Sequence, residues 1–126
     1  MFHVEEDMTI CVTRGDIAFF VVTADDAGNA YKFLPGDVVR IKVFARKNCE
    51  QVVLEKDFVV EEETEAVHIY LEGKDTKIGE VINKPVIYWY EIELNPDTNP
   101  QTIVGYDDDG PKLFRLFPEG KDKEDM

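Results

Sequence analysis

Short stretches of alternating apolar and polar residues, separated by turn-forming residues, recur along almost the whole chain. A period of two places successive side chains on opposite faces, as in a β-strand with one buried face. About eight candidate strands are found, at residues 8–13, 17–24, 38–45, 52–58, 66–71, 84–96, 101–106 and 112–117. Residues 17–24 differ from the others because they form a nearly continuous apolar run, which predicts a strand covered on both faces or a short buried helix, and the aromatic and β-branched residues favour the strand. Glycine, proline, asparagine and aspartate separate them, and almost no segment has a helical period. The sequence therefore predicts an all-β fold, namely an antiparallel, immunoglobulin-like β-sandwich of about seven to eight strands.

A single domain accommodates this pattern. The chain has 126 residues, of which 44% are hydrophobic, and this is enough for one hydrophobic core. We expect the domain to span residues 1–120 and to be followed by a charged, frayed tail at residues 121–126. Residues 75–78 predict a single helical turn with Asp75 as its N-cap.

The longest and most apolar candidate strand is found at residues 84–96, with the sequence KPVIYWYEIELNP. One face is predicted to be core and carries Val86, Tyr88, Tyr90, Ile92 and Leu94. The other face begins with Ile87 and Trp89 and ends with two glutamates. Apolar side chains gathered on a face that should be solvated are typical of protein interfaces. We therefore predict an interaction surface at Ile87 and Trp89, joined by Phe44 and Tyr70 on comparable faces of other strands.

The charge of the chain argues against several classes of partner. There are 27 acidic and 14 basic residues, so the net charge is −13. Phosphate backbones and anionic membranes repel such a chain, and we expect it to bind neither nucleic acid nor membrane. The start, MFHVEEDMTI, is acidic where a signal peptide is basic, so synthesis and retention in the cytoplasm are expected. Cys11 and Cys49 are expected to be free thiols, because cytosolic disulfides are rare.

An acidic run, Asp107-Asp108-Asp109-Gly110, is the strongest metal-site candidate in the sequence. Aligned to an EF-hand loop by its glycine, the run places Gly105 and Leu116 where two essential oxygen ligands are needed, so that template fails. A calcium site of another kind stays open. The alternative is that Asp109-Gly110 closes a hairpin between residues 101–106 and 112–117.

Other motifs are expected to have structural roles. Arg14-Gly15-Asp16 matches an integrin-recognition tripeptide, but glycine and aspartate also suit a turn between two strands. The acidic run at residues 61–65 predicts a solvated loop, and His68 predicts an exposed strand position. No nucleophile motif or paired histidine site is found, so we expect no enzymatic activity and no cofactor.

Several landmarks along the chain carry a family resemblance. In order, they are the Arg14-Gly15-Asp16 turn, the Gly36-Asp37 turn before VVRIKV, then VVLEKDF, Asp75-Thr76-Lys77, YWYEIELNP and GYDDDGPKLFRLFPEG. Together they resemble the N-terminal β-sandwich domain of phage baseplate upper proteins, which are structural proteins of tailed phages and prophages of Gram-positive bacteria. The resemblance covers residues 8 to about 120.

This resemblance implies a non-enzymatic virion protein of the baseplate, tail or head fibre. Its partners would be other phage structural proteins or further copies of itself, and it would reside in the virion after synthesis in the bacterial cytoplasm. The alternative is a carbohydrate-binding module for cell-wall glycans. In that case Trp89 and Tyr70 would supply an aromatic platform, and Asp107, Asp108 and Asp109 would supply carboxylates.

Overall fold

The computed structural model describes residues 2–4, 7–107 and 110–120. Eleven strands and one helical turn follow one another along this part of the chain. They are β1 (Phe2–Val4), β2 (Ile10–Thr13), β3 (Ala18–Val22), β4 (Asp25–Asp26), β5 (Asn29–Ala30), β6 (Val38–Phe44), β7 (Val52–Val59), β8 (Val67–Leu71), α1 (Gly73–Thr76), β9 (Val86–Leu94), β10 (Gln101–Val104) and β11 (Lys112–Phe117). The predicted all-β class is confirmed.

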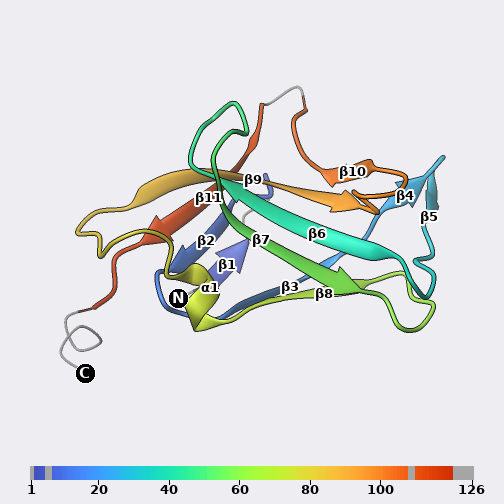
Figure 1. Cartoon of the computed structure of the whole chain (residues 1–126), viewed down its shortest axis with the longest axis horizontal. Coiled ribbons are helices and arrows are strands. Elements are labelled where there is room, and N and C mark those ends of the chain that lie inside the picture. The colour runs from blue at the N-terminus through green and yellow to red at the C-terminus, as the bar shows by residue number, and fades with distance from the viewer. Residues whose placement is uncertain (1, 5–6, 108–109, 121–126) are drawn as a thin grey trace.

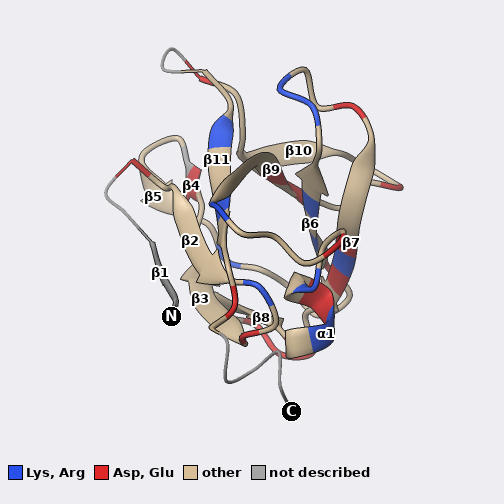
Figure 2. Cartoon of the chain, turned by 90° about the vertical axis from the view of Figure 1, so that its left-hand side faces the viewer, with Lys and Arg blue, Asp and Glu red and all other residues tan. Residues whose placement is uncertain are grey.

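Seven strands form one curled sheet in the order β1-β2-β11-β9-β6-β7, with β10 also paired to β9. This sheet curls into a half-barrel, and the two-stranded sheet β3–β8 lies across the open side of the half-barrel (Figures 1 and 2). The sandwich-like arrangement is therefore confirmed. Its strands divide into groups of seven, two and two, which is less even than the four and three of an immunoglobulin constant domain.

One strand pair departs from the predicted antiparallel pattern. β11 runs parallel to β2 on one side and antiparallel to β9 on the other. The last strand of the domain therefore lies between an early strand and the long β9 strand. Parallel neighbours need a long crossover connection, and here the whole chain between β2 and β11 supplies it.

The core lies between the concave side of the large sheet and the inner side of β3–β8. As predicted, β9 points Tyr90, Ile92 and Leu94 into this core, with Tyr88 partly buried beside them. Each fully buried aliphatic side chain contributes about 1.5–3 kcal/mol relative to an exposed position. The other fully buried aliphatic and aromatic side chains include Ile10, Val12, Phe33, Val39, Ile41, Val43, Ile69, Leu71, Phe114 and Leu116.

The hairpin predicted between residues 101–106 and 112–117 is wrong. β10 and β11 both pair with the same edge of β9, β11 along residues 86–90 and β10 along residues 92–94. They therefore lie end to end on that edge. Only the tip of the connection closes as a turn, where the Gly110 N–H donates to the Asp107 carbonyl at 2.9 Å.

A single helical turn is present, but it lies two residues before the predicted 75–78 and its capping differs. α1 begins at Gly73, with Glu72 as its N-cap, and Asp75 is the third residue of the turn. The Glu72 N–H donates to the Asp75 carboxylate at 2.8 Å, so Asp75 caps from inside the turn.

The turn that contains Arg14-Gly15-Asp16 is a buried structural joint. Arg14 is buried, and its guanidinium donates to the Ile78 and Gly79 carbonyls and pairs with Glu119 at 2.9 Å. The Gly15 N–H donates to the buried Thr76 hydroxyl at 3.0 Å. This burial takes Arg14 away from solvent and agrees with the structural role expected for the tripeptide.

Candidate interaction surfaces

Strand pairing brings most of the predicted interface residues onto the outer face of the large sheet. Phe44 lies opposite Trp89, and Trp89 lies opposite Leu113 on its other side. Ile87 follows on β9, and Val52 lies opposite Phe44 on β7. We call these five residues the outer-sheet patch.

Burial limits what the outer-sheet patch presents to solvent. Ile87 is 47% exposed, and Trp89 is half-buried. Phe44 is only 4% exposed, so its assignment as an interface residue is wrong. Phe44 ends β6, and Trp89 and Val52 flank it on the two neighbouring strands.

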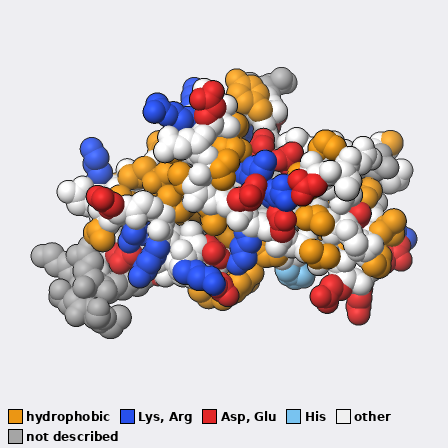
Figure 3. All heavy atoms as spheres, in the orientation of Figure 1, with side chains coloured by type: hydrophobic (Ala, Val, Ile, Leu, Met, Phe, Trp, Pro, Cys, Tyr) orange, Lys and Arg blue, Asp and Glu red, His pale blue; other side chains and the backbone are white. Residues whose placement is uncertain are grey.

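The remainder of the same outer face is occupied by ion pairs. The Arg40 guanidinium lies within 4.0 Å of Glu55, Asp57 and Asp97, and Lys42 lies 3.5 Å from Glu93. Figure 3 shows acidic and basic side chains close together over β6 and β7. Hydrogen bonds from Arg40 lower the pKa of Asp97 below its ordinary value. The charges on this half of the face are thus paired with one another within the chain.

A second and more exposed apolar surface lies on the outer side of β3–β8. Tyr70 is opposite Phe19 in this small sheet, and His68 is opposite Val21. Phe19 is 61% exposed, Ile17 52%, Val21 51% and Tyr70 42%. We call Ile17, Phe19, Val21 and Tyr70 the β3–β8 face. Tyr70 is thus confirmed as exposed, but on a different sheet from Trp89.

Residues 17–24 were expected to be a strand covered on both faces or a short buried helix. The strand is confirmed, but the prediction that both of its faces are buried is wrong for one face. Ala18 and Val22 point into the core, while Phe19 and Val21 point to solvent. Phe19 and Val21 share a period of two with Ile17, as residues on one face of a strand do, but in a continuous apolar run this period does not show which face is exposed.

Acidic side chains border the β3–β8 face. Glu61, Glu62, Glu63 and Glu65 are exposed in the connection before β8, as predicted for a solvated loop, and Glu72 is exposed directly after β8. On the side of β7, the Lys56 ammonium lies 5.9 Å from the centre of the Tyr70 ring and 2.8 Å from an Asp75 oxygen. Glu72 in turn pairs with the Lys74 ammonium at 3.2 Å, so the acidic rim of this surface is formed mainly by the glutamates of residues 61–65.

The described residues that a metal site or a glycan platform would require do not lie together. Asp108 and Asp109 lie outside the described residues, and Asp107 pairs with Lys112 at 2.6 Å. Among the residues that the structure describes, no group of three or more His, Cys, Asp or Glu side chains is placed to hold a metal ion. Trp89 and Tyr70 lie on separate sheets and do not form one aromatic platform.

The two cysteines form no disulfide. Cys11 is buried and Cys49 is half-buried. Burial raises the pKa of the Cys49 thiol, and the nearby Glu91 carboxylate adds to this. A thiol with a raised pKa is a poor nucleophile near neutral pH.

Comparison with known proteins adds no relative to this picture. A scan of family models, a search of curated proteins and a search of solved structures each found no match to the chain. Within the described residues, none of the helices has the length and apolar character needed to cross a membrane.

Proposed function

We propose that this protein is a non-enzymatic adaptor that acts through protein–protein contacts, with the β3–β8 face as its docking surface. The observation that carries the proposal is the group of four exposed apolar side chains on one small sheet: Ile17, Phe19, Val21 and Tyr70. Contiguous exposed apolar side chains, aromatic ones above all, are typical of interface centres. The resemblance to baseplate upper proteins supports a place for this contact in a phage particle.

The rim of the face specifies the chemistry of the partner. Exposed glutamates at positions 61–63 and 65 precede β8 at one end of the apolar centre, and the whole chain has a net charge of −13. Two copies docked through this same face would bring their acidic rims together, which is unfavourable. The proposed partner is therefore a different protein, with an apolar centre bordered by lysine and arginine.

The experiment measures binding of this chain to each purified product of the genes that flank its own gene. We expect one of them to bind, and to associate more slowly as salt is raised, because salt screens the complementary rims. Phe19→Ser and Val21→Ser should each weaken this binding by about fivefold or more, as expected for residues at the centre of an interface.

Val59→Ser is the matched control. Val59 is a valine with a similarly large exposed fraction, but it lies on β7 of the large sheet, so its replacement should leave binding unchanged. Thermal denaturation of the three variants checks that each is folded. Binding that survives both Phe19→Ser and Val21→Ser would overturn the docking surface. Absence of binding to every flanking gene product, or self-association that Phe19→Ser abolishes, would overturn the proposed partner.

A further inference from the structure

A groove of about 640 Å³ lies between β10 and the chain segment that runs from the end of β3 to Tyr31. Its volume is within the range of about 300–1,000 Å³ that is typical of small-molecule sites. β10 pairs with β9 alone among the described strands, and the groove runs along its other side. Neither the outer-sheet patch nor the β3–β8 face contributes a residue to it.

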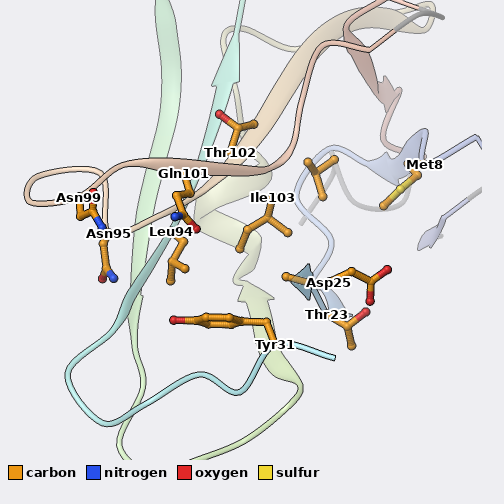
Figure 4. A pocket seen from close by; sticks show the side chains of 12 residues that line it. Met8, Thr23, Asp25, Tyr31, Leu94, Asn95, Asn99, Gln101, Thr102 and Ile103 are labelled. Atoms are coloured by element: carbon orange, nitrogen blue, oxygen red, sulfur yellow. The ribbon is translucent and has the colours of Figure 1, made fainter. Parts of the chain in front are cut away.

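One wall of the groove is the aromatic ring of Tyr31, which contacts Asp37 and Phe33. Figure 4 shows the Tyr31 ring with one flat face toward Leu94 and Ile103 across the groove. The Tyr31 hydroxyl donates to Asp37 at 3.3 Å, and the Tyr31 ring meets Phe33 edge to face at 5.0 Å. Asp37 also accepts a hydrogen bond from the Asn95 side chain at 3.1 Å. The ring is thus positioned before any ligand arrives.

Neutral polar side chains line other parts of the groove. The amides of Asn99 and Gln101 and the hydroxyls of Thr23 and Thr102 line the groove (Figure 4). Amides and hydroxyls both donate and accept hydrogen bonds, which suits ligand hydroxyl groups that do the same. Asp25 adds a carboxylate, and no lysine or arginine is among the described lining residues, so the groove disfavours anionic ligands.

The groove continues into a smaller apolar cavity. This cavity has a volume of about 190 Å³ and shares Met8, Thr23 and Val104 with the groove. Its other lining residues include Ile10, Phe20, Val21 and Ile92. A ligand in the groove therefore has hydrogen-bonding groups on one side and a space for a methyl-sized apolar group on the other.

We propose that this groove binds a neutral, N-acetylated saccharide. A sugar ring presents a flat C–H face that stacks on an aromatic ring such as Tyr31, and its hydroxyls match the amides and threonines. The acetamido methyl group fits the apolar cavity. The groove itself shares no residue with the proposed docking surface, but the apolar cavity beside it is lined in part by Val21 of the β3–β8 face. Variants at Tyr31 and Gln101 therefore test saccharide binding, and Phe19→Ser tests docking, without touching the shared residue.

The test is a titration of the whole chain with tri-N-acetylchitotriose, here called chitotriose, and with cellotriose, monitored by two-dimensional amide NMR and calorimetry. These trisaccharides differ only in carrying an acetamido group or a hydroxyl at the second carbon of each ring. We expect chitotriose to shift amide signals of residues 23–31 and 99–104, and to bind about fourfold or more tightly than cellotriose, because the methyl group is buried. Glucuronic acid should not bind.

Variants locate the site. Tyr31→Ala should weaken chitotriose binding by about fivefold or more, while Tyr31→Phe retains the ring and most of the affinity. Gln101→Ala should weaken it, and Asn83→Ala, an exposed amide outside the groove, should not. Phe19→Ser should leave saccharide binding intact. Absence of any chitotriose-induced shift would overturn the site. Equal affinity for cellotriose would overturn the N-acetyl preference, and binding unchanged by Tyr31→Ala would overturn the stacking contact.

Discussion

Arg14 joins three parts of the chain that are distant in sequence. It extends from the end of β2 to the carbonyls of Ile78 and Gly79 and to Glu119 near the end of the described chain. Arginine suits this position because its planar group donates in several fixed directions, whereas lysine offers a single point charge.

Arg14→Lys is therefore expected to destabilise the fold. It leaves the buried Ile78 carbonyl without its guanidinium donor, and the free energy of unfolding should fall by about 1–3 kcal/mol. Urea denaturation measures this. Arg46→Lys, at an exposed position, should change stability by less than about 0.5 kcal/mol. Equal stability of the Arg14→Lys and wild-type proteins would contradict the role given to this joint.

Thr76 is a second buried polar residue at the same joint. Its hydroxyl accepts from the Gly15 N–H at 3.0 Å and donates to the Asp16 carbonyl at 2.7 Å. Thr76→Val keeps the shape and removes both bonds, so we expect a loss of about 1–3 kcal/mol in urea denaturation. Thr76→Ser retains the hydroxyl and should lose much less. A reversed order of the two variants would count against this account.

Asp75 gives the fold a dependence on pH. Burial alone would raise the pKa of Asp75, but hydrogen bonds from Lys56 and from the Glu72 N–H outweigh it, so its pKa lies below the ordinary value of 3.8. A group with a lowered folded pKa stabilises the protein above its unfolded pKa, and this is lost as pH falls through the folded value. Asp75→Asn should therefore be less stable than wild type at pH 7, with the difference shrinking below about pH 4. Urea midpoints across this range measure it, and a constant difference would contradict the linkage.

At the scale of elements, β9 was predictable from sequence in both position and facing. Its alternation places Tyr90, Ile92 and Leu94 in the core and Ile87 on the outer face, as expected. Periodicity alone did not predict how deeply outer-face residues are covered. Trp89 is half-buried between Phe44 and Leu113, because their strands are its neighbours in the sheet. The alternation of apolar and polar residues does not predict the order of the strands.

Trp89→Ala tests this difference directly. A half-buried tryptophan should contribute about 1–2 kcal/mol through burial, so the variant should be less stable in chemical denaturation. Binding of the adaptor's partner should be unchanged, because Trp89 lies away from the β3–β8 face. Loss of binding without loss of stability would move the docking surface to the outer-sheet patch.

Two features could not be predicted from the sequence: the exposed face of residues 17–24 and the groove beside Tyr31. Residues 17–24 form a nearly continuous apolar run, and such a run does not distinguish a strand covered on both sides from one that offers Phe19 and Val21 to a partner. The groove beside Tyr31 was missed for a similar reason. Its walls come from segments near residues 23, 31, 95 and 101, which only the tertiary fold brings together.

For the whole molecule, net charge governs association. Self-association through the β3–β8 face would bring acidic rims together, so the chain alone is expected to be monomeric at physiological salt. Light scattering at increasing protein concentration measures this. A stable ring or trimer formed by the isolated chain would contradict the proposed choice of partner and favour assembly from identical copies.

The central claim is that the β3–β8 face is covered when the protein functions. Hydroxyl-radical footprinting of the chain, free and bound to the partner found among its neighbouring gene products, tests it most directly. Phe19 and Tyr70 should be oxidised in the free chain and strongly protected in the complex, whereas Tyr106, which is 76% exposed, should be oxidised equally in both. Unchanged oxidation of Phe19 and Tyr70 in a saturated complex would contradict the claim.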